Sequence, residues 1–407
     1  MTYLNAKKYV SSAPEPIGES STNIIRLLEH LGDIQYQRMK YLRLAGSNGK
    51  TVCAEMLRAV LRRGGYVVGC LRMPLREEPR DNICIGDSPI SMEEFSEHVN
   101  ELKCLSLDFT PTKSELLLAV ALLAFKRAGC EICIIESDHF GDDPSILLPP
   151  PFAAVICGAI PNEDAAQTAR IRAYIRRGIQ EIVSAPQNSS AYRLISDTCY
   201  SINCRLTLPS RTAIEVLRLG FRGTEFRYKG ADYTLNMCGR FQISNAVLVL
   251  ETVEMLARRG FPISNDAVRA ALSFLKIPSK FEVVSISPLM IVDSTHTPVA
   301  IRTVCDSLSD FEQTANKSIH LCLPQGDIIN DYISVLSSLN YKIARVMTVG
   351  SQPQGDVNGV PIAVYKTHKA LATAALRELS RDDLFMVSGS YPFVSPIRYQ
   401  LLATLGF

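Results

Sequence analysis

One short stretch constrains the fold of this chain more than any other. It joins an apolar run at residues 42–45, a turn flanked by Gly46 and Gly49, and an apolar pattern at helical spacing that ends at Gly64. The glycines let backbone N–H groups approach an anion, and the N-terminus of the following helix adds partial positive charge. The stretch therefore predicts an α/β fold built around a phosphate-binding loop.

The polar residues of this turn suit a nucleotide with its metal. Lys50 supplies a full positive charge, and Thr51 can offer its hydroxyl to Mg²⁺. The spacing is shorter than the usual G-x-x-x-x-G-K-[ST], so an ordinary glycine turn between a strand and a helix is the alternative. The positions of Gly, Lys and Thr favour the phosphate loop. The residues expected to bind the nucleotide here are Gly46, Ser47, Asn48, Gly49, Lys50 and Thr51.

Bulk properties limit the class of protein. A chain of 407 residues is too long for one ordinary core, so we expect at least two domains. A net charge of +2 argues against nucleic acid or a membrane surface as partners. No apolar run has the length of a spanning helix, and the first residues lack the apolar centre of a signal peptide. The 12 cysteines are scattered along the chain, and we interpret them as free buried thiols, which persist in a reducing compartment. We therefore expect a soluble cytoplasmic protein.

Further apolar segments place the loop in a larger sheet. We expect strands at residues 66–71, 131–136 and 153–157, and a long buried helix at 116–127. Glu136 ends its strand, where ligands of open α/β sheets bind. A solvated strand end is the alternative for this carboxylate, but a strand so close to the phosphate loop favours a metal ligand.

The middle of the chain carries helix-start and turn signals. Ser91 and Glu94 have the spacing of a capping box. Residues 200–235 predict short β-rich pieces. A helix with an apolar face is expected at 246–259, and Asn245 is a candidate for its N-cap.

The C-terminal part predicts a second α/β unit. We place the boundary near residue 285, which gives an N-terminal domain of residues 1–285 and a C-terminal domain of residues 286–407. Asp293 ends the first strand of this domain and His296 follows three residues later, an arrangement that favours a site over a solvated histidine. Strands that alternate with helices predict a mostly parallel sheet with helices on both faces. These strands are expected at 318–323, 343–349, 360–364 and 384–388.

Several of these segments resemble the motifs of the folylpolyglutamate synthase and dihydrofolate synthase family, in the Mur ligase superfamily. A-G-S-N-G-K-T at residues 45–51 is similar to the family's A-G-T-N-G-K loop. The resemblance implies a Mur-ligase-type ATPase domain with a phosphate loop, followed by a smaller Rossmann-like domain. Other similar segments lie at residues 82–91, 185–187, 239–246, 278–283, 293–298 and 388–394.

The resemblance also implies an activity. Members of this family phosphorylate a folate carboxylate with ATP, and the amine of glutamate then attacks the acyl phosphate. It implies ATP and Mg²⁺ as cofactors, a folate-like acid and glutamate as partners, and a monomer. It implies metal ligands at Thr51, Glu136 and Glu163, and further nucleotide contacts at Gln242, Asn245, Lys280, Asp293 and His296.

The chain departs from the family around the second metal. Met73 stands in place of a serine, Glu163 in place of a histidine, and Arg176 in place of a lysine that is carbamylated to hold the metal. Arg176 is expected on a helix at residues 170–179. Glu163 is an oxygen ligand that suits Mg²⁺, and Arg176 would supply positive charge. The residues expected to be catalytic are Lys50, Glu163, Arg176 and His296.

Two functions from different classes remain open. The first is an ATP-dependent amide ligase with a rebuilt metal site. The second is a nucleotide-binding paralogue that no longer ligates, since the nucleotide residues alone fit both. A Mur-type ligase acting on a cell-wall precursor is a weaker third, because it would normally carry an extra substrate domain before the phosphate loop.

Overall fold

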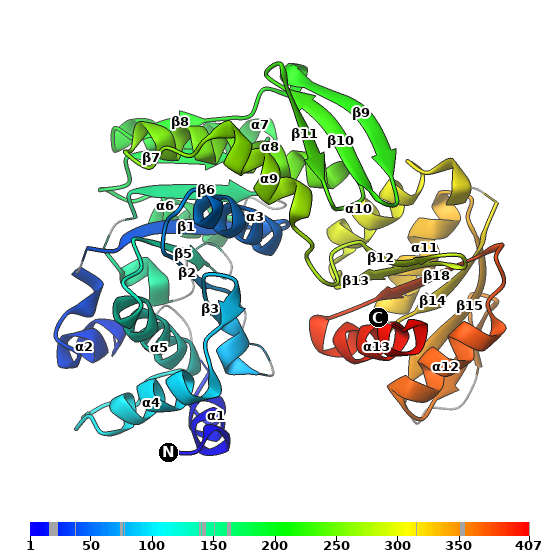
Figure 1. The fold of residues 1–407 in the computed structure, drawn as a ribbon, viewed down its shortest axis with the longest axis horizontal. Coiled ribbons are helices and arrows are strands. Elements are labelled where there is room, and N and C mark those ends of the chain that lie inside the picture. The colour runs from blue at the N-terminus through cyan, green and yellow to red at the C-terminus, as the bar shows by residue number, and fades with distance from the viewer. Residues whose placement is uncertain are drawn as a thin grey trace. The chain divides into compact units, whose positions relative to one another are not determined.

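The chain divides into two compact units, and among the described residues the first contains one sheet and the second contains two (Figure 1). The first unit comprises Met1–Arg211 and Asn245–Leu272, and the second comprises Thr212–Ser244 and Ser273–Phe407. The domains 1–285 and 286–407 remain a prediction. The two compact units have different bounds from these predicted domains, because Thr212–Ser244 belongs to the same unit as the C-terminal residues.

The computed structural model describes most of the chain. None of the helices within the described ranges combines the length and the apolarity that crossing a membrane requires. Glu163, one of the predicted metal ligands, lies outside the described residues. The described ranges are 1–15, 23–36, 38–73, 76, 78–137, 140, 144–149, 151–160, 164–314, 316–350 and 355–406.

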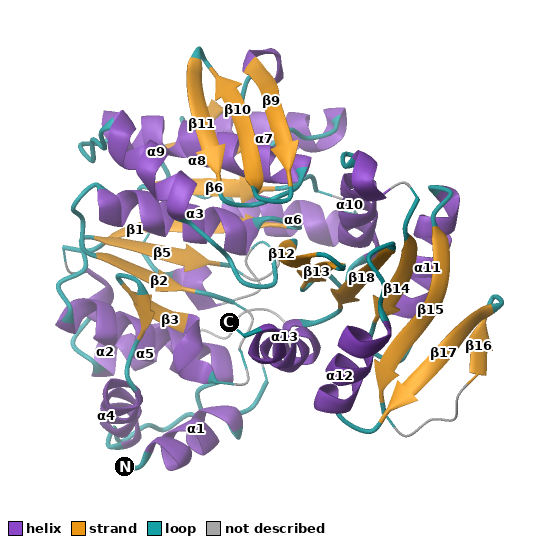
Figure 2. Cartoon of the chain, turned by 45° about the vertical axis from the view of Figure 1, so that its right-hand side comes forward, coloured by secondary structure: helices purple, strands orange, loops and turns teal. Residues whose placement is uncertain are grey.

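The first unit is built on an eight-stranded sheet in the order β4-β3-β2-β5-β1-β6-β7-β8 (Figure 2). The strands from β2 to β8 in this order run parallel, and β3 and β4 add an antiparallel edge. The central strands are continuous apolar runs because helices cover both faces of a parallel sheet. The strands are β1 (Lys40–Gly46), β2 (Val68–Leu71), β3 (Ile83–Ile85), β4 (Ser88–Pro89), β5 (Ile132–Glu136), β6 (Ala153–Cys157), β7 (Glu181–Ser184) and β8 (Arg205–Thr207).

The helices of this unit pack on the two faces of the sheet. On one face α5 is buried on nearly every side and shares a core with α1, α2 and α4. The predicted capping box of Ser91 and Glu94 is confirmed at the start of α4. The helices are α1 (Tyr3–Ser11), α2 (Asn23–His30), α3 (Lys50–Arg63), α4 (Met92–Lys103), α5 (Lys113–Arg127), α6 (Ala165–Tyr174) and α7 (Ser189–Ser201), with most of α8 (Arg240–Arg258) and α9 (Asn265–Phe274).

Two helix predictions are wrong in their bounds. The helix expected at 170–179 is α6, which ends at Tyr174, because Ile175 leaves the helical region at φ −91° and ψ 80°. Arg176 therefore follows the helix instead of lying on it. The helix expected to start at residue 246 begins at Arg240, so Asn245 lies inside α8 and is not its N-cap. The apolar pattern used for the prediction begins only in the second turn of this helix.

The second unit begins with a small antiparallel sheet in the order β11-β10-β9, which confirms the β-rich pieces expected at 200–235. Its alternating polar residues face outward, while Phe226, Tyr228 and Leu235 are buried. The strands are β9 (Ile214–Gly220), β10 (Gly223–Tyr228) and β11 (Ala231–Leu235).

The main sheet of the second unit has the order β12-β13-β18-β14-β15-β17-β16. It is parallel except for its edge strands β12 and β16, and all four strands predicted in this region are present. Helices α10 and α11 share a core on one face, and α12 and α13 share a core on the other. The elements are β12 (Glu282–Ile286), β13 (Leu289–Asp293), β14 (Ser318–Cys322), β15 (Lys342–Val349), β16 (Gly355–Val357), β17 (Val360–Tyr365), β18 (Asp383–Ser388), α10 (Pro298–Leu308), α11 (Ile328–Ser338), α12 (His368–Glu378) and α13 (Tyr391–Leu405).

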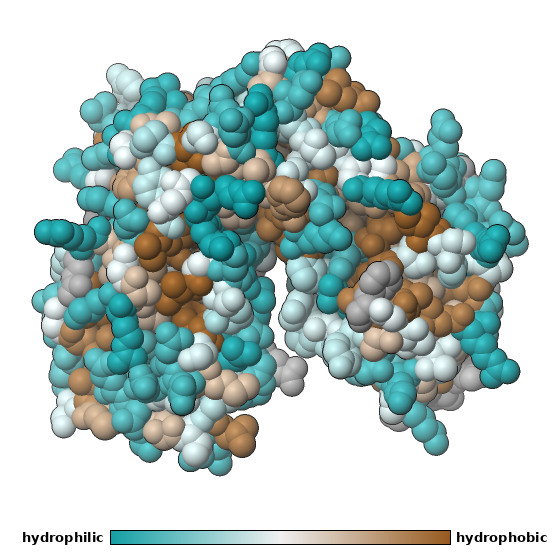
Figure 3. Space-filling view, in the orientation of Figure 1, coloured by the Kyte–Doolittle hydropathy of each residue, from teal (hydrophilic) through white to brown (hydrophobic). Residues whose placement is uncertain are grey.

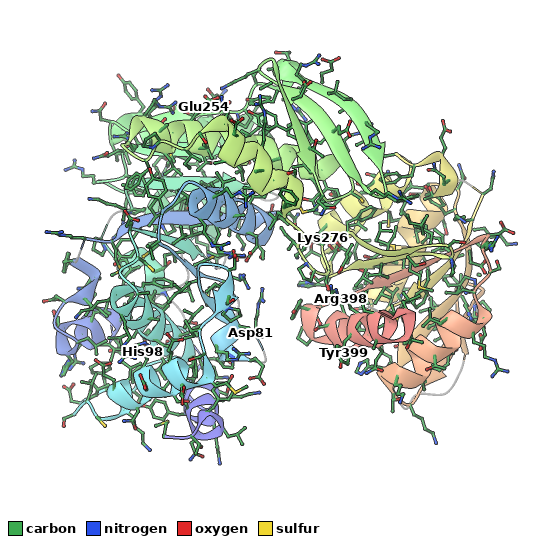
Figure 4. All side chains as sticks on the ribbon, viewed as in Figure 1. Asp81, His98, Glu254, Lys276, Arg398 and Tyr399 are labelled. Carbon is green, nitrogen blue, oxygen red and sulfur yellow. The ribbon has the colours of Figure 1, made fainter. Side chains whose placement is uncertain are left out.

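On the face drawn in the space-filling view, hydrophilic residues lie among apolar ones (Figure 3). An ion pair fixes α13 to the edge of its sheet: Arg398 donates two hydrogen bonds to Glu282 on β12, at 2.5 and 2.7 Å (Figure 4). The C-terminal helix is thus tied to the strand that begins the sheet.

Candidate functional site

The turn after β1 is held by glycines that no other residue could replace without rearrangement. Gly46 has φ +136°, and a Cβ there would lie 1.8 Å from the carbonyl oxygen of Cys157. Gly49 is the left-handed N-cap of α3, and a Cβ there would lie 2.5 Å from the Oδ1 of Asn245. The loop therefore needs glycine because its backbone packs directly on β6 and α8.

The end of β6 supports the loop from the other side. Ser47 donates a hydrogen bond from its Oγ to the carbonyl of Ala159, at 2.6 Å. Gly158 has φ +68°, and a Cβ there would lie 2.9 Å from the carbonyl oxygen of Asn48. These contacts leave Lys50 as the first residue of α3, at the positive end of the helix.

A buried carboxylate lies beside the loop. Glu136 ends β5, is 1% exposed, and its Oε1 accepts a hydrogen bond from the Oγ1 of Thr51 at 2.8 Å. A hydroxyl and a carboxylate are oxygen donors of the kind that Mg²⁺ takes together with water and phosphate oxygens. Within the described residues there is no cluster of three or more His, Cys, Asp or Glu side chains, so this pair would hold a metal only with such additional oxygens.

A small pocket opens next to Glu136. Its walls are mainly apolar and include Met73. Met73 packs against the core that α5 shares, and a thioether is a poor ligand for Mg²⁺. The lining residues are Leu71, Met73, Ser114, Leu118, Ile135, Glu136, Pro144 and Ser145.

Two predicted nucleotide residues of α8 lie in different units. Asn245 belongs to the first unit, where its side chain lies against Gly49 and the thiol of Cys53 is 4.0 Å from its Oδ1. Gln242 belongs to the second unit, is fully buried, and donates from its Nε2 to the carbonyl of Lys280 at 3.5 Å. The side chain of Asn245 thus lies against the phosphate loop, and that of Gln242 contacts the backbone of Lys280, the residue predicted to bind phosphate.

The second unit brings its own predicted residues together. Asp293 ends β13, is 2% exposed, and accepts a hydrogen bond from the backbone N–H of Phe281 at 2.7 Å. Burial raises the pKa of this carboxyl above its ordinary value, although the charge of Lys280 acts in the opposite direction. His296 is exposed in the segment between β13 and α10.

The structure places Arg176 directly after the end of α6. There the guanidinium donates to the carbonyl of Leu148. Burial, with the nearby charge of Arg43, lowers the pKa of Arg176 to about 10. The catalytic role expected for Arg176 remains a prediction.

Sequence reasoning missed a buried ion pair near the loop. Arg72 follows β2 and pairs with Glu55 on α3, and Glu55 also accepts hydrogen bonds from Arg58 at 3.0 and 2.6 Å. The signal was present in the spacing, because Thr51 and Glu55 are four residues apart and share one face of a helix. A carboxylate on the apolar face of a helix needs a positively charged partner, because an unpaired buried charge is costly.

No protein-family model matches this chain. It is 23% identical over 426 residues to the probable bifunctional folylpolyglutamate synthase/dihydropteroate synthase of Halobacterium salinarum, a match to 97% of this chain and 50% of that protein. It is 22% identical over 425 residues to the folylpolyglutamate synthase of Lacticaseibacillus casei, a match to 99% of each. The chain spans about half the length of the bifunctional relatives and nearly all of the single-function enzyme.

Solved structures share the fold. A complex of folylpolyglutamate synthase with AMPPCP and folate matches 100% of both chains with a TM-score of 0.80 at 20% identity. A likeness at this identity shows the fold alone. The expected fold class is therefore confirmed: an α/β domain with a phosphate loop, followed by a smaller Rossmann-like domain.

Proposed function

We propose that this chain, a divergent relative of the folylpolyglutamate synthases and dihydrofolate synthases of the Mur ligase superfamily, is an ATP-dependent amide ligase. Its substrates in this proposal are glutamate and a folate or a related carboxylic acid. ATP would phosphorylate the carboxylate, and the amine of glutamate would displace phosphate from the acyl phosphate.

One observation carries the proposal. The loop of Gly46 to Lys50 leads into α3 beside the hydrogen-bonded pair of Thr51 and Glu136, at 2.8 Å. Backbone N–H groups and Lys50 bind the phosphates of ATP at the positive end of this helix. Thr51 and Glu136 are the residues that would hold Mg²⁺, which when bound offsets charge on the phosphates. This arrangement serves phosphoryl transfer, whose main need is positioning and charge stabilisation.

The remaining predicted residues take supporting roles in this proposal. Asn245 lies against Gly49, the left-handed residue that precedes α3. Lys280 would bind phosphate as a point charge, without the fork that arginine has. The roles of Asp293 and His296 as nucleotide contacts remain predictions, and Gln242 donates a hydrogen bond to the backbone of Lys280. The roles of Glu163 as a further metal ligand and of Arg176 as a source of positive charge remain predictions.

Location and oligomeric state belong to the proposal as well. We place the chain in the cytoplasm as a monomer acting on small molecules. All 12 cysteines are free thiols and eleven of them are buried, which supports a reducing compartment.

The test is the release of ADP by the purified protein. Mg²⁺-ATP, glutamate and one folate from a panel of dihydropteroate, dihydrofolate and tetrahydrofolate are supplied, and each component is omitted in turn. Release that needs both the acid and the amine, and that disappears in Lys50→Ala, supports the ligase. If ATP binds tightly to the wild type and not to Lys50→Ala, yet no acid and amine pair releases ADP, the folate ligase is excluded and a nucleotide-binding paralogue is favoured.

A further inference from the structure

Arg72 and Glu136 are neighbours on one face of the sheet. Strands β2 and β5 pair in parallel, and the last registered pair is Leu71 with Ile135. Arg72 and Glu136 each follow this pair by one residue. Because side chains alternate between faces, both point away from the α5 side, where Leu71 and Ile135 are packed. Glu136 meets Thr51 of α3 on this face.

The guanidinium of Arg72 is fixed in place by the helix that carries the phosphate loop. Its partner Glu55 lies one turn after Thr51 on α3, and the two charged side chains are only 12% and 8% exposed. Arg72 also donates from its Nη1 to the carbonyl of Asp81 at 3.4 Å, and Asp81 is labelled beside β3 in Figure 4. Backbone contacts with Asn82 at 2.8 and 2.7 Å hold the residue from the other side.

The electrostatic environment agrees with this geometry. Burial by itself lowers the pKa of the Arg72 guanidinium, yet Glu55 and, more weakly, Glu136 raise it above its ordinary value. Arg72 is thus a permanent charge in a mostly buried place, where screening by water is weak. A positive charge there competes with any cation that Glu136 binds.

We propose that Arg72 is a positioning residue that limits the affinity of Glu136 for divalent cations, by holding a fixed positive charge on the neighbouring strand. The inference rests on the proposed function in placing the metal at Thr51 and Glu136. It explains how a site with few metal ligands works, because part of the positive charge comes from the protein itself. Arg72 acts through Glu136 and needs no contact with a substrate.

The test measures Mn²⁺ binding by the full-length protein, from the loss of the electron paramagnetic resonance signal of free Mn²⁺. Glu136→Gln identifies the binding that depends on the site. Arg72→Met should tighten that binding by about tenfold, because a unit charge a few ångströms from the metal is removed from a weakly screened place. Arg72→Lys, which keeps the charge, should bind Mn²⁺ as the wild type does.

Two further variants separate this effect from others. Arg72→Met frees a carboxylate of Glu55 that could itself bind Mn²⁺, so Glu55→Gln/Arg72→Met is compared with Glu55→Gln alone and should bind Mn²⁺ more tightly than that variant. Arg62→Met is the matched control. Arg62 lies on α3, as Glu55 does, but its side chain is half exposed and pairs with Asp87. This substitution should leave Mn²⁺ binding unchanged. Melting curves of all variants show whether they are folded.

The outcomes are distinguishable from those of the ligase assay. Unchanged Mn²⁺ affinity in folded Arg72→Met overturns the inference, and so does a double variant that binds Mn²⁺ no more tightly than Glu55→Gln does. Binding that Glu136→Gln does not weaken also overturns it, because the metal is then elsewhere. Tightening in both variants without any ligase activity in the wild type upholds the inference and refutes the proposed substrates alone.

Discussion

At the scale of single residues, close packing of backbone decides the phosphate loop. Gly46 and Gly158 sit at positive φ where β1 and β6 approach, and Gly49 meets Asn245. Lys50 carries its charge and Thr51 its hydroxyl in any fold. The loop keeps its shape, however, only because no Cβ lies between it and the end of β6 or α8. The first prediction concerns this contact.

Replacing Gly46 by alanine should disrupt the loop. The new methyl group would lie 1.8 Å from the carbonyl oxygen of Cys157, and that backbone cannot move without disturbing β6. We expect a loss of unfolding free energy of about 2 kcal/mol or more, from overpacking added to an unfavourable φ. Chemical denaturation checks this. Gly355→Ala is the control, because nothing lies within 4 Å of its Cβ position, and equal losses in the two variants would contradict the prediction.

At the scale of elements, α4 contains a histidine in an apolar place. His98 is 2% exposed within the layer of α4 and α5 (Figure 4). Neither ring nitrogen has a hydrogen-bond partner among the described residues. Burial lowers the pKa of His98, with Arg127 acting in the same direction and Glu101, Glu94 and Glu97 in the other. The packing of this helix therefore favours a neutral imidazole.

This arrangement predicts a pH dependence of stability. The pKa of His98 in the folded state lies below its unfolded value of about 6.5, so the unfolded state binds the proton first as the pH falls. The free energy of unfolding should decrease as the pH drops through about 6.5, and level off below the folded pKa. His98→Leu should show a flatter dependence in urea titrations between about pH 7.5 and pH 5. A dependence of equal slope in the variant would refute this account.

Other elements show how far local signals reach. The capping box at Ser91 and the strands of both sheets follow from periodicity and turn residues, and these were predictable. The end of α6 and the start of α8 were not. Helix ends depend on which backbone groups find partners nearby, and α6 stops where its carbonyl at Tyr174 meets the buried guanidinium of Arg43.

At the scale of the whole molecule, each unit has cores of its own and the phosphate loop belongs to the first. A ligand that binds only the folded state stabilises it according to its concentration relative to the dissociation constant. Unfolding of a chain with two units need not be a single transition, so midpoints are compared instead of free energies.

The nucleotide analogue AMPPCP with Mg²⁺ should therefore raise the midpoint of thermal unfolding. At a hundredfold excess over the dissociation constant the stabilisation is about 2.7 kcal/mol, which corresponds to a shift of several degrees. Removing Mg²⁺ with a chelator should reduce the shift, and Lys50→Ala should abolish it. A shift of full size in Lys50→Ala would place the nucleotide away from the loop.

The sequence by itself determined the phosphate loop, the α/β class and the order of the strands along the chain. These depend on local spacing: a glycine turn between an apolar run and a helix, and apolar runs at regular intervals. Glu136 was predictable for the same reason, since the end of a strand beside the loop is a position in the sequence as well as in space.

Only the tertiary structure decided what surrounds these residues. It set Arg72 beside Glu136 through the register of β2 and β5, and it placed the guanidinium of Arg176 against the carbonyl of Leu148. It also packed Asn245 against Gly49, from a residue far along the chain. Strand register and helix direction bring distant residues together, and a pattern read along one segment contains no information about the neighbour it will meet.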